Sequence, residues 1–343
     1  MTSKKCIALY SGGLDSILVV KMMQDQSIDV VPVCFCSPFF GMDALQDPEP
    51  FKELHRSRYG IDVHPVDFSH EIIRIISDPK HGYGKNLNPC IDCKIGMFKK
   101  AGELMKALDA SFVVTGEVLG QRPMSQRRDA MNLIIKETGL KDVLLRPLCA
   151  KHLPPTLPER EGLVRRELLG DIAGRGRKVQ IELAKKYGIS PDALPTPAGG
   201  CLLTYGQIAD KVRSTFKRFQ PCLPSPADVM LDTIGRKFIL DDKTVLVVSR
   251  DEEENKKLSR LVFPGNVFMK IADVPGPLCI IRGDDSGGSY EKAAGICLRY
   301  GKARGKSGHT AVYGPDPLTM TGTVSAPVLD DDCCQALQID MNT

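Results

Sequence analysis

The chain has 343 residues, of which 42% are hydrophobic and 26% charged, and its formal net charge is +4 at pH 7. This length supports two domains with separate cores, and no apolar run approaches the roughly eighteen residues that a membrane helix needs. The N-terminus enters a strand almost at once and leaves no room for a signal peptide, so we expect a cytoplasmic protein without a membrane anchor. The weakly basic balance permits a nucleic-acid partner without requiring one.

The first predicted element is a buried strand at 6–10, which runs into the glycine-rich turn SGGLDS at residues 11–16 and then into a helix. Free backbone N–H groups and the positive end of the helix dipole meet at such a turn, which therefore suits an anion such as pyrophosphate. Gly12 and Gly13 allow a close approach of phosphates, and Ser11 and Ser16 add hydroxyl donors. Asp15 fits a metal or orienting role, since Mg²⁺ can bridge a carboxylate and phosphates. The alternative is an ordinary strand-to-helix turn, and the pattern matches neither the P-loop nor the dinucleotide-binding motif.

Residues 5–150 alternate apolar strands with amphipathic helices, which predicts an α/β fold built on a doubly wound parallel sheet. Strands are expected at 6–10, 30–36, 62–66, 112–115 and 143–145, and helices near 16–26, 47–58, 92–108 and 124–137. Ligands of such sheets lie off the carboxyl ends of the strands, which is where the glycine-rich turn is expected.

The second half of the chain begins with a basic, proline-rich stretch at 151–178, which indicates either a solvated loop and helix or a surface that follows phosphates. A proline-rich linker is predicted at 221–230, and a smaller α+β domain follows it at 231–315. We therefore expect a nucleotide-binding domain at 1–220, the linker, the second domain, and a flexible tail at 316–343.

Twelve cysteines in a chain expected in the cytoplasm are better explained as reduced thiols, metal ligands or catalytic groups than as disulfides. Cys90 and Cys93 form a C-x-x-C pair, and Cys201 lies in a Gly-Gly-Cys turn where nothing structural requires a cysteine. Three thiols without a comparable fourth ligand argue against a closed structural zinc site. An iron–sulfur cluster with one iron open to exogenous sulfide fits three ligands. The alternative is direct thiol chemistry, in which one thiol carries a persulfide and another resolves it.

Four segments together resemble, in order and spacing, the tRNA 4-thiouridine synthetase family of the ThiI type, a branch of the PP-loop ATP pyrophosphatases. They are YSGGLDS at 10–16, CSPFF at 36–40, VTGEVLGQ at 114–121 with SQ at 125–126, and LRPL at 145–148. The resemblance covers roughly residues 5–205 and implies an adenine nucleotide alpha hydrolase-like fold for the first domain. No segment resembles the ferredoxin-like, THUMP or rhodanese domains of typical members.

This resemblance implies which residues contact ATP and which carry sulfur. The implied ATP contacts are Leu9, Tyr10, Ser11, Gly12, Gly13, Asp15, Ser16, Cys34, Phe35, Lys94, Gly116 and Gln126. Cys201 falls where that family carries its catalytic cysteine, and the Cys90–Cys93 pair is similar to that of tRNA thiolases whose cluster is held by three cysteines. The module at 231–315 resembles the RNA-binding NFACT-R domain. Its candidate phosphate contacts are Arg236, Lys237, Arg282, Arg299, Lys302, Arg304 and Lys306.

The function implied is an ATP-dependent tRNA sulfurtransferase, which adenylates a uridine carbonyl oxygen and replaces it with sulfur. Its expected cofactors are ATP, Mg²⁺ and a [4Fe–4S] cluster at Cys90, Cys93 and Cys201, with zinc or no metal as alternatives. Asp15 and these three cysteines are the expected catalytic residues. The expected partners are tRNA and a sulfur donor, either free sulfide or a persulfide-carrying protein, with a homodimer as one possible assembly. Two alternatives are an adenylating ligase or sulfur-insertion enzyme acting on a small molecule, and an RNA- or ribosome-binding adaptor with a residual nucleotide site.

Overall fold

The computed structural model describes residues 4–195, 200–283, 288–302 and 309–339. The chain divides into two compact units, Met1–Cys201 and Leu202–Thr343. This division lies about one helix earlier than the domain limit expected at residue 220, because the helix at 206–219 packs with the second unit. None of the helices in the described ranges is long and apolar enough to cross a membrane.

The N-terminal unit is built on a five-stranded parallel sheet in the order β3-β2-β1-β4-β5. Its strands are β1 (Lys5–Leu9), β2 (Asp29–Cys36), β3 (His64–Asp67), β4 (Phe112–Thr115) and β5 (Leu144–Leu145). Leu9 pairs with Val33 of β2 on one side and with Thr115 of β4 on the other. The sheet therefore reverses its winding between β1 and β4, and the predicted doubly wound α/β fold is confirmed.

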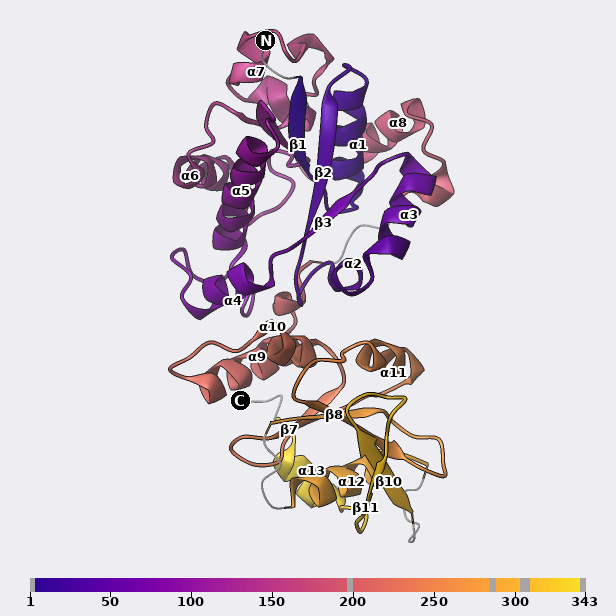
Figure 1. Cartoon of the computed structure of the whole chain (residues 1–343). Coiled ribbons are helices and arrows are strands. Elements are labelled where there is room, and N and C mark those ends of the chain that lie inside the picture. The colour runs from indigo at the N-terminus through magenta and orange to yellow at the C-terminus, as the bar shows by residue number, and fades with distance from the viewer. Residues whose placement is uncertain (1–3, 196–199, 284–287, 303–308, 340–343) are drawn as a thin grey trace. The chain divides into compact units, whose positions relative to one another are not determined.

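Helices cover both faces of this sheet (Figure 1). One face carries α1 (Leu14–Gln24), α3 (Pro48–Tyr59) and α8 (Lys178–Lys186), and the other carries α4 (Ser69–Ser77), α5 (Cys90–Ala107) and α6 (Arg128–Thr138). The short helices α2 (Met42–Gln46) and α7 (Leu157–Arg160) lie in the connections. Four consecutive α1 residues, Ile17–Val20, are fully or almost fully buried. A helix that is apolar all round needs partners on several sides, and α1 contacts both the sheet and α8.

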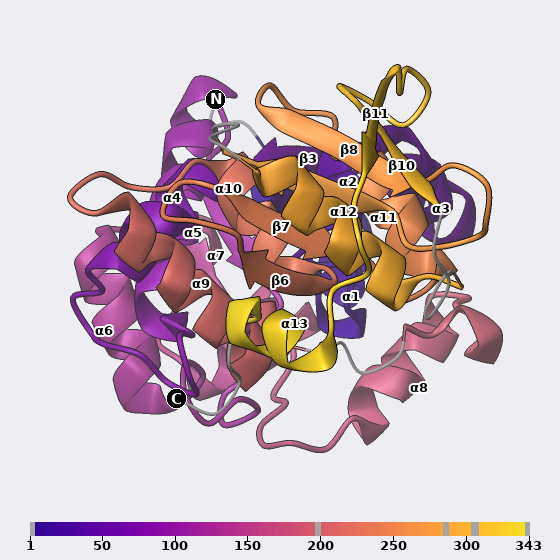
Figure 2. The ribbon, with the colours of Figure 1, turned by 90° about the horizontal axis from the view of Figure 1, so that it is seen from below.

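The C-terminal unit contains a six-stranded antiparallel sheet in the order β11-β10-β8-β9-β7-β6. Its strands are β6 (Arg236–Ile239), β7 (Val245–Val248), β8 (Asn266–Ile271), β9 (Cys279–Arg282), β10 (Thr310–Gly314) and β11 (Gly322–Ser325). On one face lie α9 (Gly206–Phe219), α10 (Pro226–Met230) and α11 (Glu252–Ser259), and on the other α12 (Ser289–Tyr300) and α13 (Asp331–Leu337). Figure 2 shows α12 and α13 together in front of the sheet.

Residues 316–339, expected to be a flexible tail, contribute an edge strand and a packed helix. Cys334 of α13 is buried in the same core cluster as Phe238 of β6. The backbone N–H of Ile339 donates to the carbonyl of Lys237 at 3.1 Å, so residues 338–339 cover the outer edge of β6. Apolar contacts and this hydrogen bond thus give the segment a defined place in the second unit.

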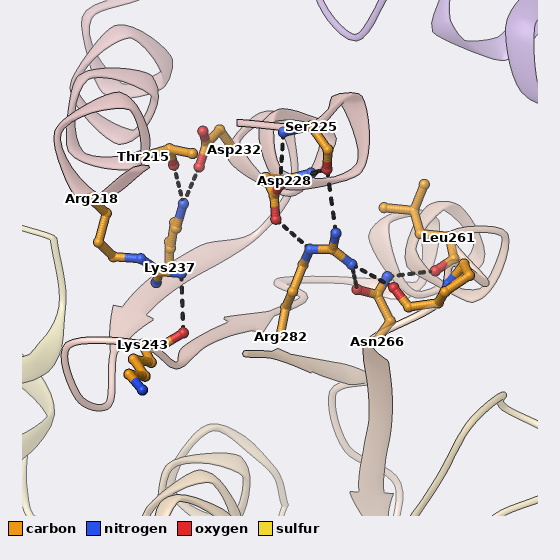
Figure 3. A network of polar contacts seen from close by, with 11 residues as sticks. Thr215, Arg218, Ser225, Asp228, Asp232, Lys237, Lys243, Leu261, Asn266 and Arg282 are labelled. Carbon is orange, nitrogen blue, oxygen red and sulfur yellow. Dashed lines mark hydrogen bonds and ion pairs between the residues drawn. The ribbon is translucent and has the colours of Figure 1, made fainter. Parts of the chain in front are cut away.

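A buried polar network fixes α9 to β6 (Figure 3). Lys237, only 4% exposed, pairs with the fully buried Asp232 and with the hydroxyl of Thr215. Lys211 of α9 donates to the carbonyl of Gly235 at 2.6 Å. Arg282 of β9 forms a second group of contacts with Asp228, Ser225, Asn266 and the carbonyl of Pro264. Leaving such buried charges unpaired is costly, so residues 206–234 must fold together with the sheet.

Burial lowers the pKa of Lys211 from 10.5 to about 8. The unfolded chain therefore holds one more proton than the folded chain between these two pH values, and the free energy of unfolding should rise as the pH rises from 8 to 10. We expect Lys211→Met to flatten this rise, and Lys217→Met, at an exposed position of the same helix, to leave it unchanged. Urea unfolding at pH 7.5, 8.5 and 9.5 measures the slopes. Equal slopes in wild type and Lys211→Met would exclude a lysine of lowered pKa at this position.

Candidate nucleotide and thiol site

The glycine-rich turn follows β1 directly and opens α1. Gly12 has the left-handed φ of 72°, which allows the chain to reverse without a Cβ clash. The Ser16 hydroxyl donates to the carbonyl of Gly13 at 2.7 Å and accepts from the N–H of Ser11 at 3.2 Å. Ser16 therefore shapes the turn, whereas Ser11 is exposed. No side chain caps the start of α1 at Gly13, so the first N–H groups of the helix are available to a ligand.

The chain directly after β4 packs closely against the start of α1. A Cβ on Gly116 would lie 2.8 Å from the carbonyl carbon of Asp15 and 2.9 Å from the nitrogen of Ser16, so only glycine fits. The Gln121 side-chain amide donates to the Asp15 carboxylate at 3.0 Å. The loops after β1 and β4 thus flank the point where the winding of the sheet reverses, which is the usual ligand position in this fold.

A buried ionic group lies at the same carboxyl edge of the sheet. Glu117, 2% exposed and two residues beyond β4, accepts from the Lys94 ammonium at 2.6 Å and from Arg146 at 2.8 Å. Burial would raise the pKa of Glu117, but the two cations outweigh it and hold the pKa below its ordinary value. The carboxyl group of Glu117 therefore stays ionised. Together with Lys94 and Arg146 it forms a cluster with one net positive charge.

Two buried polar atoms that lack a hydrogen-bond partner among the described residues are Arg146 Nη2, within this cluster, and Gln126 Oε1, in the loop after β4. A buried donor and acceptor left open in this way mark a place for a ligand or water. Gln126 is one of the expected ATP contacts, whereas no role was predicted for Glu117 or Arg146. Both lie within two residues of the end of a buried strand and inside the quoted motifs, and this is the signal by which they could have been predicted.

The other expected ATP contacts are more deeply placed. Tyr10 is buried and hydrogen-bonded to His55, Leu9 is half-buried at the end of β1, and Cys34 and Phe35 are buried within β2. The Cys34 thiol lies 3.8 Å from that of Cys36. These side chains therefore lie mostly below the surface, at the carboxyl ends of β1 and β2.

The three candidate thiols share one neighbourhood. Cys90 and Cys93 lie in the first turn of α5, next to Lys94. Burial first, and then the nearby thiols of Cys201 and Cys90, raise the pKa of Cys93 well above its ordinary value. Burial also raises the pKa of Cys90, against opposing effects of Lys94, Asn88 and Arg122. None of the three cysteines forms a disulfide.

No group of three or more histidine, cysteine, aspartate or glutamate side chains is arranged to hold a metal within the described ranges. Cys201 follows directly after residues 196–200, most of which lie outside those ranges. The donor types nevertheless suit an iron–sulfur cluster, because thiols are deprotonated on binding a metal and nearby cations favour their charged form. Lys94 lies near both Cys90 and Cys93, and Arg122 lies near Cys90.

Several expected phosphate-binding cations are instead used inside the protein. Lys237 and Arg282 belong to the buried networks, and Arg299 pairs with Asp331. Arg236 lies over the ring of Tyr300, 4.7 Å from its centroid, and Lys302 is exposed. Arg304 and Lys306 lie outside the described residues.

The arginines of the basic stretch at 151–178 also differ in their surroundings, since some form ion pairs within the protein and one is exposed beside the candidate site. Arg160 pairs with Asp142, and Arg166 pairs with Glu159. Arg175 is exposed and lies next to the loop after β4. Its position is set by the preceding residue, Gly174, whose N–H donates to the carbonyl of Leu119 at 2.7 Å. Arg175 and Arg122 thus lie on neighbouring loops at the edge of the candidate site.

Comparisons with known proteins agree with this division into two parts. Residues 1–152 match the family described as Thiamine biosynthesis protein (ThiI), and residues 235–327 match the NFACT protein RNA binding domain. A probable tRNA sulfurtransferase of Thermococcus kodakarensis is 29% identical over 153 residues, which cover 43% of this chain and 37% of the relative. One from Methanothermobacter thermautotrophicus is 28% identical over 203 residues, which cover 58% of this chain and 44% of the relative. The chain thus spans less than half the length of these relatives.

Solved structures show weak overall similarity. A 4-thiouridine synthetase–RNA complex with bound ATP has 18% identity and a TM-score of 0.33, covering 54% of this chain and 50% of that one. The U34-tRNA thiolase NcsA from Methanococcus maripaludis, with its [4Fe-4S] cluster, has 15% identity and a TM-score of 0.32, covering 67% and 71%.

Proposed function

We propose that this chain, which carries a ThiI domain followed by an NFACT-type RNA-binding domain, is an ATP-dependent tRNA sulfurtransferase that makes thiouridine. One observation carries the proposal. The first turn of α5 holds Cys90 and Cys93 together with Lys94, whose ammonium binds Glu117 at the carboxyl end of β4. A single helix start therefore joins a thiol site to the edge of the sheet where the glycine-rich turn lies.

The chemistry begins with activation of a uridine carbonyl oxygen, because oxide is a very poor leaving group. The oxygen attacks the α-phosphorus of ATP, an O–P bond forms, and pyrophosphate leaves. The free N–H groups at the start of α1 would hold the pyrophosphate, with Lys94 and Arg146 adding positive charge. Mg²⁺ would be held by Asp15 and would spread the charge of the phosphates. Sulfur then adds to the activated carbon, and the C–O bond breaks with release of AMP.

Cys90, Cys93 and Cys201 are the residues proposed to deliver sulfur. A [4Fe–4S] cluster held by these three thiolates would supply an open iron for exogenous sulfide. In the alternative, one thiol carries a persulfide from a donor protein and a second thiol releases the sulfur by forming a disulfide. The cluster version requires all three thiols to be neighbours, and the persulfide version requires two of them to be. The effect of the nearby thiols of Cys201 and Cys90 on the pKa of Cys93 supports this grouping.

The proposed function is tested by AMP formation in the presence and absence of tRNA, with nucleoside mass spectrometry of the RNA. We expect AMP formation that depends on tRNA and a thiolated uridine in the product. AMP formation that ignores RNA would favour a small-molecule substrate, and binding of RNA without AMP formation would favour an adaptor. Loss of a thiouridine in tRNA from a strain lacking the protein would identify the modified position.

The C-terminal unit is proposed to supply tRNA affinity rather than chemistry. We expect a chain that ends at Tyr205 to keep ATP binding but to bind tRNA more weakly than the full chain. The truncated chain ends at Tyr205, before α9, because Lys211 and Thr215 of α9 belong to the buried network of the second unit. Each lost phosphate contact should lower the slope of log K against log salt by about 0.7 to 0.9.

The control for this truncation is the full chain with Arg236→Ala and Lys302→Ala, which removes two cations without removing a domain. We expect this variant to lose part of the same salt dependence. Equal tRNA affinity and equal salt slope in the truncated and full chains would assign RNA recognition to the N-terminal unit, with Arg122 and Arg175 as the first candidates.

A further inference from the structure

His55 of α3 lies beneath the glycine-rich turn, although nothing in the sequence motifs gives it a role. The side chain is only 6% exposed, and its Nδ1 lies 2.8 Å from the Tyr10 hydroxyl. The ring packs at 4.4 Å from Phe51, 5.2 Å from Tyr10 and 5.7 Å from Tyr59, measured between ring centroids. Three aromatic side chains therefore hold the imidazole in one orientation.

The remaining edge of the imidazole faces the turn itself. A Cβ built on Gly12 would lie 3.2 Å from His55 Cε1 and 3.5 Å from Nε2. Since Tyr10 occupies Nδ1, Nε2 is the ring nitrogen left to meet a ligand at the turn. Nε2 forms no hydrogen bond to any residue in the described ranges, and it is not among the fully buried polar atoms without a partner.

The protonation state of His55 suits this position. Burial first, and then the charge of Arg58, lower the pKa of His55, while burial keeps the proton on the neighbouring Tyr10. The charged or titratable groups that face the ring are Tyr10 after β1, and Arg58 and Tyr59 on its own helix. A neutral imidazole carries one N–H, and a Tyr10 hydroxyl that donates to Nδ1 places that hydrogen on Nε2.

We propose that His55 binds the pyrophosphate end of the nucleotide, with its Nε2–H donating to a phosphate oxygen held at Gly12. Tyr10 acts as a positioning residue that selects this tautomer. The arrival of a phosphate anion favours the doubly protonated imidazolium, so pyrophosphate binding is accompanied by uptake of a solvent proton at Nδ1. The Tyr10 hydroxyl then accepts from the Nδ1–H group instead of donating to Nδ1. This inference rests on the proposed ATP site but not on sulfur transfer.

The test measures binding of inorganic pyrophosphate to the full chain by calorimetry, at fixed Mg²⁺ and pH 7, in two buffers of different ionisation enthalpy. AMP, which lacks the pyrophosphate group, is the matched ligand. We expect His55→Phe, which keeps an aromatic ring, to weaken pyrophosphate binding about tenfold, as expected for loss of a hydrogen bond to a charged group. AMP binding should remain unchanged. The proton uptake that accompanies pyrophosphate binding to the wild type should be absent from the variant.

A second variant separates donation from packing. His55→Gln keeps an N–H donor that does not titrate, so it should recover part of the pyrophosphate affinity without the proton uptake. Wild-type affinity and proton uptake in His55→Phe would overturn the proposal, as would an equal loss of AMP and pyrophosphate binding in both variants. Intact pyrophosphate binding in a wild-type protein that never thiolates RNA would instead count against the proposed function alone.

Discussion

Replacing any one of Cys90, Cys93 and Cys201 with alanine is expected to lower thiouridine formation by about 10³-fold, and the triple variant should lose little more. Residues that act as one unit are strongly non-additive, because the first loss already disables the site. The neighbouring thiols that raise the pKa of Cys93 are the structural reason to treat the three as a unit. ATP binding should stay intact, since the glycine-rich turn and Gly116 are not altered. Nucleoside mass spectrometry measures the product, and equilibrium binding measures ATP.

Cys222→Ala is the matched control, because this exposed thiol lies in the second unit and should leave activity unchanged. Protein purified without oxygen should be brown and contain iron and acid-labile sulfide. Colourless, zinc-containing protein that still thiolates RNA would reject the cluster in favour of thiol chemistry. Full activity of Cys201→Ala would reject both versions of the site.

The parallel sheet and the place of the glycine-rich turn could be predicted because both depend on local patterns. Five apolar runs separated by amphipathic helices specify a doubly wound sheet, and a turn after the first strand must then lie at its carboxyl edge. The ThiI and NFACT-R resemblances were confirmed by the matches to residues 1–152 and 235–327. The roles of the individual site residues stay predictions.

Long-range charge pairing could not be predicted in this way. Glu117 meets Arg146 from a position 29 residues earlier in the chain, and only the sheet brings them together. Lys237 was expected to contact RNA, but side chains of a strand alternate between faces. Phe238 points into the core beside α12, so Lys237 points to α9 and meets Asp232 there. The same contacts place α9 in the second unit, so the first unit ends at residue 201, whereas the first domain was expected to end at residue 220.

Asp15→Asn and Ser11→Ala are each expected to lower AMP formation by about 10²-fold or more with the fold intact. Asp15 lies in the first turn of α1, where its carboxylate accepts a hydrogen bond from Gln121, and asparagine keeps this shape without the charge that would hold Mg²⁺. Ser11 lies at the exposed start of the turn, so its loss removes a donor near the departing pyrophosphate rather than a core contact.

Asp25→Asn at the other end of α1 is the control for the charge change, and should keep full activity because Asp25 is exposed and remote from the turn. Circular dichroism and thermal unfolding should be the same for all variants. The loss in Asp15→Asn should not be recovered by raising ATP to saturation, since the carboxylate is proposed to act on the departing phosphates as well as on binding. Wild-type AMP formation by both Asp15→Asn and Ser11→Ala, with tRNA present, would show that the turn is only a structural link between β1 and α1.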